Sequence, residues 1–381
     1  MSEIRHHLSE EQHTLTNLAG LTAIAAVIIY FLLFADFALV EHGRRSVGEA
    51  GLGNLMIVVG LSGALGSLAA AFRFKPDNGS GPLTAGFAGC ALAACLSLWT
   101  SHAIAAYASG ILTGACLGWT TVLLTLSLRP TLHLKKLGLC CGLGTGAAYA
   151  FCSQPLVFSA TPRTQSAIAI FVALAGLAAS FRLRSEPIKP STSNDFRPFL
   201  AGIFVLLFLI LACLDSAAFF IIQRNPIVKA DTWENVVTLQ GNAFVHLCAA
   251  VLAGIALDRR QLALTLGTAL LALLGSCVFL TGADRHFPAA RACYTVGVSI
   301  GTTALVFYPA RSGRPWLAGL LLSIFLWFGT AAGICYAQWH PTLSRPLLVI
   351  TGLVVVTAFM IRHFRLKYLH ATGEASRHDN P

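Results

Sequence analysis

Two aspartates, Asp36 and Asp215, are the residues whose type and surroundings most strongly suggest chemistry. Each lies in the outer third of a long apolar segment, FADFALV in one case and CLDSAAFF in the other. An ionised carboxylate in hydrocarbon is costly, and such groups almost always face an aqueous cavity or a polar partner. One interpretation is a structural pair with Asn54, Asn242 or a loop arginine such as Arg44 or Arg224. The other is a titratable or cation-binding pair, in which mutual repulsion keeps at least one carboxyl protonated near neutrality.

His246 is a third candidate for proton or substrate binding. It follows Asn242 by four residues, so both side chains share one face of a helix. A proton relay or a substrate ligand is one interpretation, and a hydrogen bond to a neighbouring helix is the other. Aromatic side chains offer candidates for the wall of a substrate cavity, although plain packing explains them equally well: Trp119, Trp327, Tyr107 and Tyr294.

Other patterns resemble catalytic motifs but lack the required context. Ser299 stands in a Gly-x-Ser-x-Gly sequence, yet inside an apolar segment rather than on the strand-to-helix turn of a hydrolase. The glycines of residues 142–146 lack the preceding strand and following Lys-Ser/Thr of a phosphate loop. We interpret both as helix-packing residues. None of the eleven cysteines has zinc-ligand spacing. We therefore expect no catalytic residue, metal or cofactor.

The candidate residues belong to twelve apolar segments of about 15 to 25 residues, near the length that a helix needs to cross a bilayer. Backbone polar groups in lipid must be satisfied within each segment, which predicts helices. The predicted fold class is an all-α membrane protein with twelve transmembrane helices in two pseudo-symmetric six-helix bundles. The segments span residues 18–40, 55–72, 83–99, 104–126, 137–151, 166–181, 199–222, 236–257, 262–280, 289–307, 316–337 and 347–361.

Composition and charge agree with a membrane protein. Charged residues are 11% of the chain, against about 25% in soluble domains. With the N-terminus assigned to the cytoplasm, 18 of the 26 lysines and arginines fall on the cytoplasmic side. This bias predicts that both termini are cytoplasmic, and it explains the net charge of +10 without a nucleic-acid partner. We expect a multi-pass, monomeric protein of a cell membrane, such as a bacterial inner membrane, whose partner is the lipid bilayer.

The chain divides into two halves of six segments each. A proline- and serine-rich stretch predicts a cytoplasmic linker between them. Matching features recur in the same order in both halves: an acid in the first segment, Gly-Asn near the start of the second, Tyr-x-x-Gly-x-x-x-Gly in the fourth, and Gly-Thr before a tyrosine in the fifth. We expect an internal duplication. The predicted parts are a cytoplasmic tail (1–16), a bundle (17–183), the linker (184–197), a second bundle (198–363) and a second cytoplasmic tail (364–381).

Two further features accompany this layout. The loop after the eighth segment reads Gly-Ile-Ala-Leu-Asp-Arg-Arg at residues 254–260, and the fifth segment is rich in glycine. Together with the six-plus-six arrangement, these features resemble the major facilitator superfamily of secondary transporters over residues 15–365. The resemblance implies alternating access between two bundles around a central site.

The resemblance also implies a cytoplasmic gate. Asp258, Arg259 and Arg260 match the family's Gly-x-x-x-Asp-Arg loop motif. The corresponding loop of the first half keeps Arg73 but has Phe72 where the family has an acid. We therefore expect the latch to operate from the second half.

The function expected from these features is secondary active transport of a small solute, coupled to protons. Two membrane acids and one histidine, with no mid-membrane Lys or Arg, favour a cationic or neutral solute over an anion. Two alternatives from other classes are an intramembrane enzyme that uses Asp36 and Asp215, and a non-transporting membrane chaperone or receptor.

Overall fold

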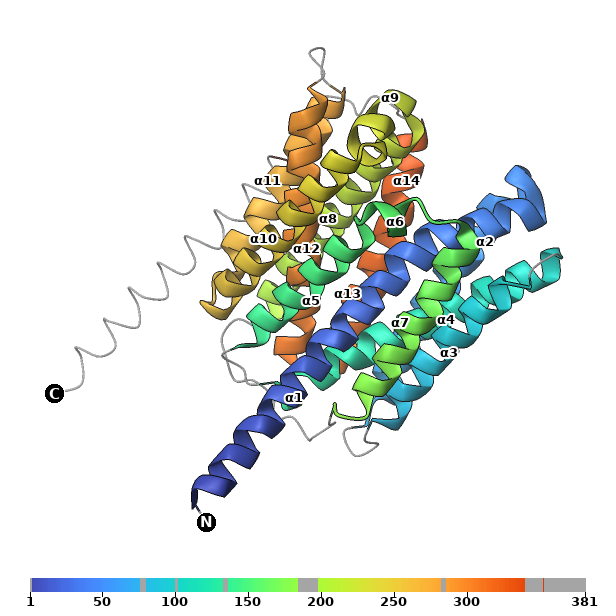
Figure 1. Ribbon diagram of the computed structural model, residues 1–381. Helices are drawn as coiled ribbons and strands as arrows, with labels where there is room; N and C mark the ends of the chain where they lie inside the picture. Colours follow the sequence, from blue (N-terminus) through green and yellow to red (C-terminus); the bar gives the residue numbers. More distant parts are fainter. Residues whose placement is uncertain are drawn as a thin grey trace.

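The computed structural model describes residues 2–75, 80–99, 102–132, 136–183, 198–281, 286–339 and 352. These residues form helices joined by short connections, with no β-strand among them (Figure 1). The all-α fold class is therefore confirmed. Eleven of the twelve expected segments correspond to helices of the structure. The twelfth, 347–361, lies outside the described residues except at residue 352, as do the linker 184–197 and the tail 364–381, so the count of twelve stays a prediction.

The helices of the first half follow one another with short connections. Their bounds are α1 (Ser2–Ile29), the π-helical η1 (Tyr30–Ala38), α2 (Leu39–Arg73), α3 (Gly81–Ser97), α4 (Ala103–Thr131), α5 (Leu137–Cys152), α6 (Pro155–Phe158) and α7 (Pro162–Ser180).

The helices of the second half repeat this pattern. Their bounds are α8 (Pro198–Arg224), α9 (Pro226–Lys229), the π-helical η5 (Ala230–Glu234), α10 (Val236–Asp258), α11 (Leu262–Thr281), α12 (Phe287–Ser312), α13 (Pro315–Leu322), the π-helical η6 (Ser323–Gly329) and α14 (Thr330–Trp339).

Length and composition make the chain a multi-pass membrane protein. Among the described residues, eight helical stretches are long and apolar enough to cross a membrane, and α3 and α5 are shorter apolar helices. The first stretch, Thr14–Arg73, has 60 residues. As one straight helix it would be about 90 Å long, three times the hydrocarbon thickness. Its path breaks at Gly48, whose φ of 73° and ψ of 173° are accessible mainly to glycine. This break separates the first two expected segments.

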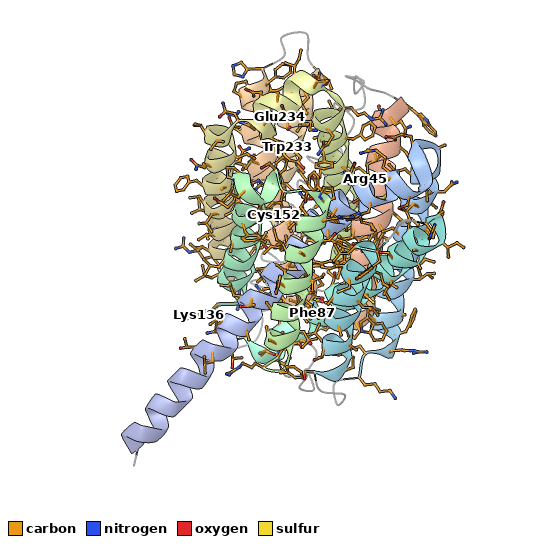
Figure 2. The ribbon with its side chains drawn as sticks, turned by 45° about the vertical axis from the view of Figure 1, so that its right-hand side comes forward. Arg45, Phe87, Lys136, Cys152, Trp233 and Glu234 are labelled. Carbon is orange, nitrogen blue, oxygen red and sulfur yellow. The ribbon has the colours of Figure 1, made fainter. Side chains whose placement is uncertain are left out.

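Small residues allow the two halves to pack closely. Helix α5 of the first half packs along α10 of the second, and α2 packs along α13 and η6. A Cβ added to Gly138 would meet the backbone carbonyl of Gly254, and one added to Gly142 would meet that of Ala250. Glycine is therefore needed where α5 approaches α10, which agrees with the packing interpretation of the fifth segment. Within the first half, a Cβ added to Gly176 would meet the ring of Phe87. Phe87 is labelled in Figure 2.

Candidate functional site

A cavity of about 160 Å³ lies between the two halves. Its wall comes from α1, η1, α4 and α5 on one side and from α8, α12, α13, η6 and α14 on the other. Asp36 and Asp215 both line it, together with Tyr149 and Tyr294. No lysine, arginine or histidine is among the described residues of the lining. The sequence-predicted acids therefore share one cavity, and no basic side chain lines it with them.

The two carboxylates have few partners. Asp36 lies in the π-helical η1 and Asp215 in α8, and the two interact electrostatically. The Tyr294 hydroxyl interacts with Asp215, while the Oδ1 atom of Asp215 is buried without a hydrogen-bond partner. Neither acid takes part in a salt bridge within the described residues.

The loop arginines considered as partners lie elsewhere. The Arg44 guanidinium pairs with Glu41 and Glu49, each at 2.6 Å. The Arg224 guanidinium lies 5.0 Å from the centre of the Phe220 ring. Within the part of the chain that the structure describes, neither membrane acid therefore forms a structural ion pair.

The two asparagines considered as structural partners of the acids lie elsewhere. Asn54 is exposed and is absent from the lining of the cavity. Asn242 is buried, but its Nδ2 donates to the carbonyl of Thr232 at 3.0 Å, in the middle of η5. Tyr294 instead is the residue that contacts Asp215.

His246 belongs to a polar cluster beside the cavity. Its Nδ1 lies 2.6 Å from the Ser299 hydroxyl, and its ring stacks on Tyr149 with centroids 4.6 Å apart and an interplanar angle of 9°. The Tyr149 hydroxyl lies 3.0 Å from that of Thr302. His246 is therefore hydrogen-bonded to a neighbouring helix, α12, and also supports the orientation of a tyrosine in the cavity wall. Ser299 lies inside α12, as the packing interpretation of its motif expects.

Four aromatic rings bridge the two halves next to the acids. Phe37 and Phe158 come from the first half, and Phe219 and Trp233 come from the second. The ring centroids are 5.6 Å apart for Phe37–Phe158, 6.2 Å for Phe158–Trp233, 5.5 Å for Trp233–Phe219 and 6.2 Å for Phe219–Phe37. We call this closed circuit the aromatic quartet.

The quartet lines a second, smaller cavity with His246 and Cys152. Tyr149 and Tyr294 line both cavities. Trp233 and Cys152 are both labelled in Figure 2, which gives their place in the helical bundle. Sequence reasoning missed the quartet, because its rings come from four separate segments and none of them is unusual in its own segment.

The other predicted aromatic residues lie away from both cavities. Trp119 donates from Nε1 to the carbonyl of Pro82 at 3.0 Å and so faces α3. The buried Trp327 ring packs on α2, where a Cβ on Gly63 would meet it. Tyr107 is half-buried and lines neither cavity. Of the four, only Tyr294 is part of the site.

At the opposite end of the cavity from the quartet, Asp258 connects the two halves. Its Oδ1 accepts from the backbone N–H of Gly138 at 2.6 Å, and its Oδ2 accepts from that of Leu139 at 2.9 Å. These donors are free because they lie in the first turn of α5, where a carboxylate is also favoured by the helix dipole. Asp258 thus links α10 of the second half to the N-terminus of α5 in the first half.

The basic residues predicted for the gate are exposed to solvent, in contrast to Asp258. These residues are Arg259, Arg260 and Arg73. A different arginine, Arg129 near the end of α4, donates to the carbonyl of Ser312 at 3.3 Å, at the end of α12. A positive charge at a helix C-terminus is favourable, so this contact is the electrostatic complement of the Asp258 contact.

These features define a class: a helical, multi-pass membrane protein with a two-acid cavity between two packed halves. The human organic anion transporter MFSD10 (TETRAN) has a similar structure, with a TM-score of 0.65 and 14% sequence identity, covering 92% of this chain and 99% of that chain. The chain thus has the fold of the major facilitator superfamily. No protein-family profile and no curated protein sequence matches the chain.

Proposed function

We propose that the chain is a secondary active transporter that carries a small cationic or neutral solute by alternating access and couples this to proton movement. In this proposal twelve helices form two bundles, 17–183 and 198–363, with both termini in the cytoplasm of a cell. The observation that carries the proposal is the pair Asp36 and Asp215, which share one cavity between the halves with no basic residue in its described lining.

The coupling follows from repulsion between the two carboxylates. Two like charges in a water-poor cavity repel each other more strongly than they do in bulk water. A proton or a cationic solute in the cavity relieves this repulsion, and the two therefore compete for the same pair. Competition between proton and solute is the minimum requirement for exchanging one against the other.

Alternating access needs a contact that can open at each end of the cavity. At one end, which we assign to the cytoplasm, Asp258 caps α5 and Arg129 contacts α12. At the other end the aromatic quartet joins the halves. Rocking of one bundle against the other would break one set of contacts while the other is kept.

The charge of the lining argues against an anionic solute. MFSD10 is described as an organic anion transporter. An anion bound beside Asp36 and Asp215 would face two acids with no basic side chain in the described wall to offset them. We therefore propose that this chain differs from MFSD10 in the charge of what it carries.

An intramembrane enzyme is the second candidate, and the contact between His246 and Ser299 is the observation in its favour. Ser299 lines neither cavity, however, and its hydroxyl also donates to the carbonyl of Thr295 at 2.7 Å. A nucleophile needs access to a substrate, so this pair is better explained as a link between α10 and α12.

The test is transport by the purified protein in liposomes. A thermal-shift screen of cationic, neutral and anionic solutes would select the solute, and its uptake would then be measured with and without an imposed pH gradient. We expect the gradient to drive accumulation above equilibrium. Equilibration of the solute that no gradient alters would refute proton coupling, and hydrolysis of a selected solute would favour the enzyme.

A further inference from the structure

The first cavity is an elongated apolar chamber with its acids at one end. Helix α12 lines it from Tyr294 to Val306, a rise of about 18 Å at 1.5 Å per residue. Helix α1 and the π-helical η1 line it over the same number of residues, from Ile24 to Asp36. Because Tyr294 interacts with Asp215, the polar ends of both helices coincide, and the rest of the chamber extends away from the charges.

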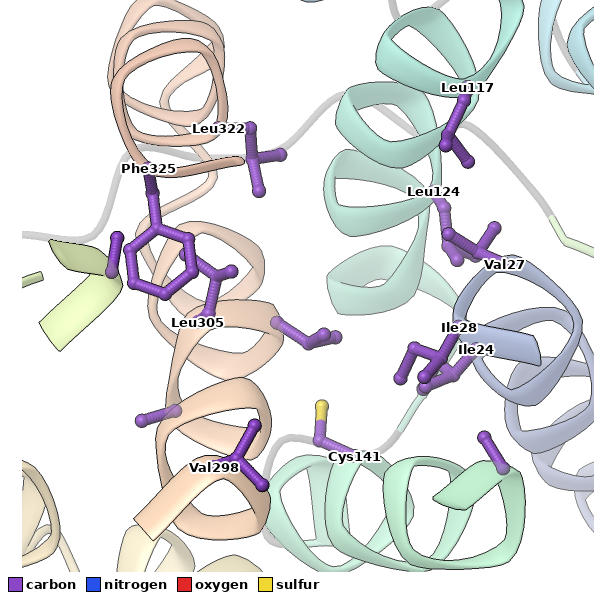
Figure 3. Close-up of a cluster of buried hydrophobic side chains, with 14 of the residues drawn as sticks. Ile24, Val27, Ile28, Leu117, Leu124, Cys141, Val298, Leu305, Leu322 and Phe325 are labelled. Carbon is purple, nitrogen blue, oxygen red and sulfur yellow. The ribbon is translucent and has the colours of Figure 1, made fainter. Parts of the chain in front are cut away.

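The far part of the chamber is almost entirely hydrocarbon. Figure 3 displays the apolar side chains that face it from α1, α4, α12, α13 and η6, which include Ile24, Leu124, Leu305, Leu322 and Phe325. Such a wall favours an apolar body, because binding removes the apolar surface of that body from water.

The few hydroxyls in this wall are already engaged. Thr121 donates to the carbonyl of Leu117 at 2.6 Å, and Thr125 donates to that of Val122 at 2.8 Å. Their protons are thus used by the helix itself. A solute with many hydroxyl groups, such as a sugar, would lose its hydrogen bonds to water here without replacement.

The acidic end offers unused acceptors for a cation. The buried Oδ1 of Asp215 has no hydrogen-bond partner in the described residues, and leaving such an atom unpaired is unfavourable. An ammonium group would donate to it and lie near Asp36. The rings of Tyr149 and Tyr294 line the same end and can contribute cation–π attraction.

From this geometry we infer that the solute is an amphipathic organic monocation, bound with its ammonium group between Asp36 and Asp215 and its apolar aryl or alkyl body along the chamber toward Ile24 and Leu305. This inference rests on the proposed function, because it assigns the solute of the same cavity. It adds the shape, the charge and the orientation of that solute.

Three probes with one body and different head groups test the charge: 4-phenylbutylammonium, 4-phenylbutanol and 4-phenylbutyrate. Their binding to the purified full chain in nanodiscs would be measured near pH 7.5 without any gradient. We expect the ammonium ion to bind at least tenfold more tightly than the alcohol, and the carboxylate to bind more weakly than either. In a variant with Asp36→Asn and Asp215→Asn this preference should fall to about threefold or less.

Alcohol binding serves as the folding control for that double variant, because the alcohol carries no charge. If the double variant does not fold, the relative affinities of the three probes for the wild-type protein still test the charge of the solute. Tighter binding of 4-phenylbutyrate than of the ammonium ion, no binding of the ammonium ion by wild-type protein, or a preference that survives in the folded double variant would each overturn the inference.

A chain-length series tests the orientation. From benzylammonium to 4-phenylbutylammonium we expect about a fourfold gain in affinity per methylene. Leu305→Ala should weaken 4-phenylbutylammonium several-fold and leave benzylammonium unchanged. Leu252→Ala, on an exposed position of α10, is the matched control and should affect neither. Equal losses for both amines in Leu305→Ala would overturn the proposed orientation.

Failure of this inference can be separated from failure of the proposed function. If the protein binds 4-phenylbutylammonium with the stated preference but does not accumulate it under a pH gradient, the inferred solute class is supported and proton coupling is refuted. If the protein accumulates a different solute under the gradient but does not bind the ammonium ion, the proposed transport function is supported and the inferred solute class is refuted.

Discussion

Replacing Asp258 with Asn should open the cytoplasmic end of the cavity. Both carboxylate oxygens of Asp258 accept backbone N–H groups, from Gly138 at 2.6 Å and from Leu139 at 2.9 Å. An asparagine keeps one acceptor but turns its amide N–H₂ toward the second donor, and it loses the charge that the N-terminus of α5 favours. Hydrogen bonds to charged groups contribute about 1.5–3 kcal/mol each, so the equilibrium should shift toward the inward-open state by roughly 10- to 150-fold. Turnover should fall while expression is preserved.

A native cysteine reports this opening. Cys141 is fully buried, and Figure 3 shows its thiol pointing toward the apolar cluster that surrounds the cavity. With the other ten cysteines replaced, the rate of maleimide labelling of Cys141 from the cytoplasmic side would be compared with and without Asp258→Asn. We expect a rise of at least tenfold. The control is Glu49→Gln, which removes the charge of an exposed acid distant from Asp258 in the sequence. It should leave the labelling rate of Cys141 unchanged.

An unchanged Cys141 labelling rate in a folded Asp258→Asn protein would refute this reasoning. It would mean that the two hydrogen bonds contribute no more to the closed state than to the open one. An equal rise in Glu49→Gln would refute the assignment in a different way, because the effect would then follow from any lost surface charge.

Three further predictions follow from the proposed function. Asp36→Asn or Asp215→Asn should abolish pH-driven accumulation in liposomes and spare gradient-free exchange, because shape is kept; full gradient-driven transport in both variants would make the acids structural. Phe158→Ala removes two ring contacts of about 0.5–1.5 kcal/mol each, so labelling of Cys152 by an impermeant thiol reagent from outside should rise about tenfold. A constant Cys152 rate would show that the quartet does not close the outer end. Reporter fusions after Thr232 and at the C-terminus should report the outer side and the cytoplasm, respectively; a C-terminus found outside would contradict the twelve-helix topology.

Strong local signals in the sequence account for the features that were predicted correctly. Apolar runs of membrane-spanning length need no tertiary context, because each helix must satisfy its own backbone. An acid within such a run is costly enough to mark a cavity, and Asp36 and Asp215 do line one. The loop motif around Asp258 implied a gate residue, but it did not indicate the contact that Asp258 makes with the first turn of α5.

The face that each helix turns toward the cavity was not predictable. In a membrane both faces of a helix are apolar, so the polar-to-apolar contrast that orients a helix in a soluble protein is weak. Trp119 could therefore face either the cavity or α3, and it faces α3. The π-helical segments add a second difficulty, since an extra residue in a turn rotates everything beyond it relative to an α-helical count. Asp36 and Trp327 both lie in such segments.

The two ends of the cavity are held by different kinds of contact, and the difference bears on coupling. Asp258 and Arg129 make directional polar contacts at helix termini, whereas the quartet packs ring against ring. The halves meet at both ends in this structure, while Asp36 and Asp215 lie between them without a basic partner in the described wall. Closing both ends over two ionised carboxylates would remove water from the pair and raise their repulsion. A cavity closed at both ends would therefore require a proton or a cation at the pair. Under the proposed function, the empty protein with both carboxylates ionised would then be unable to pass from one open state to the other.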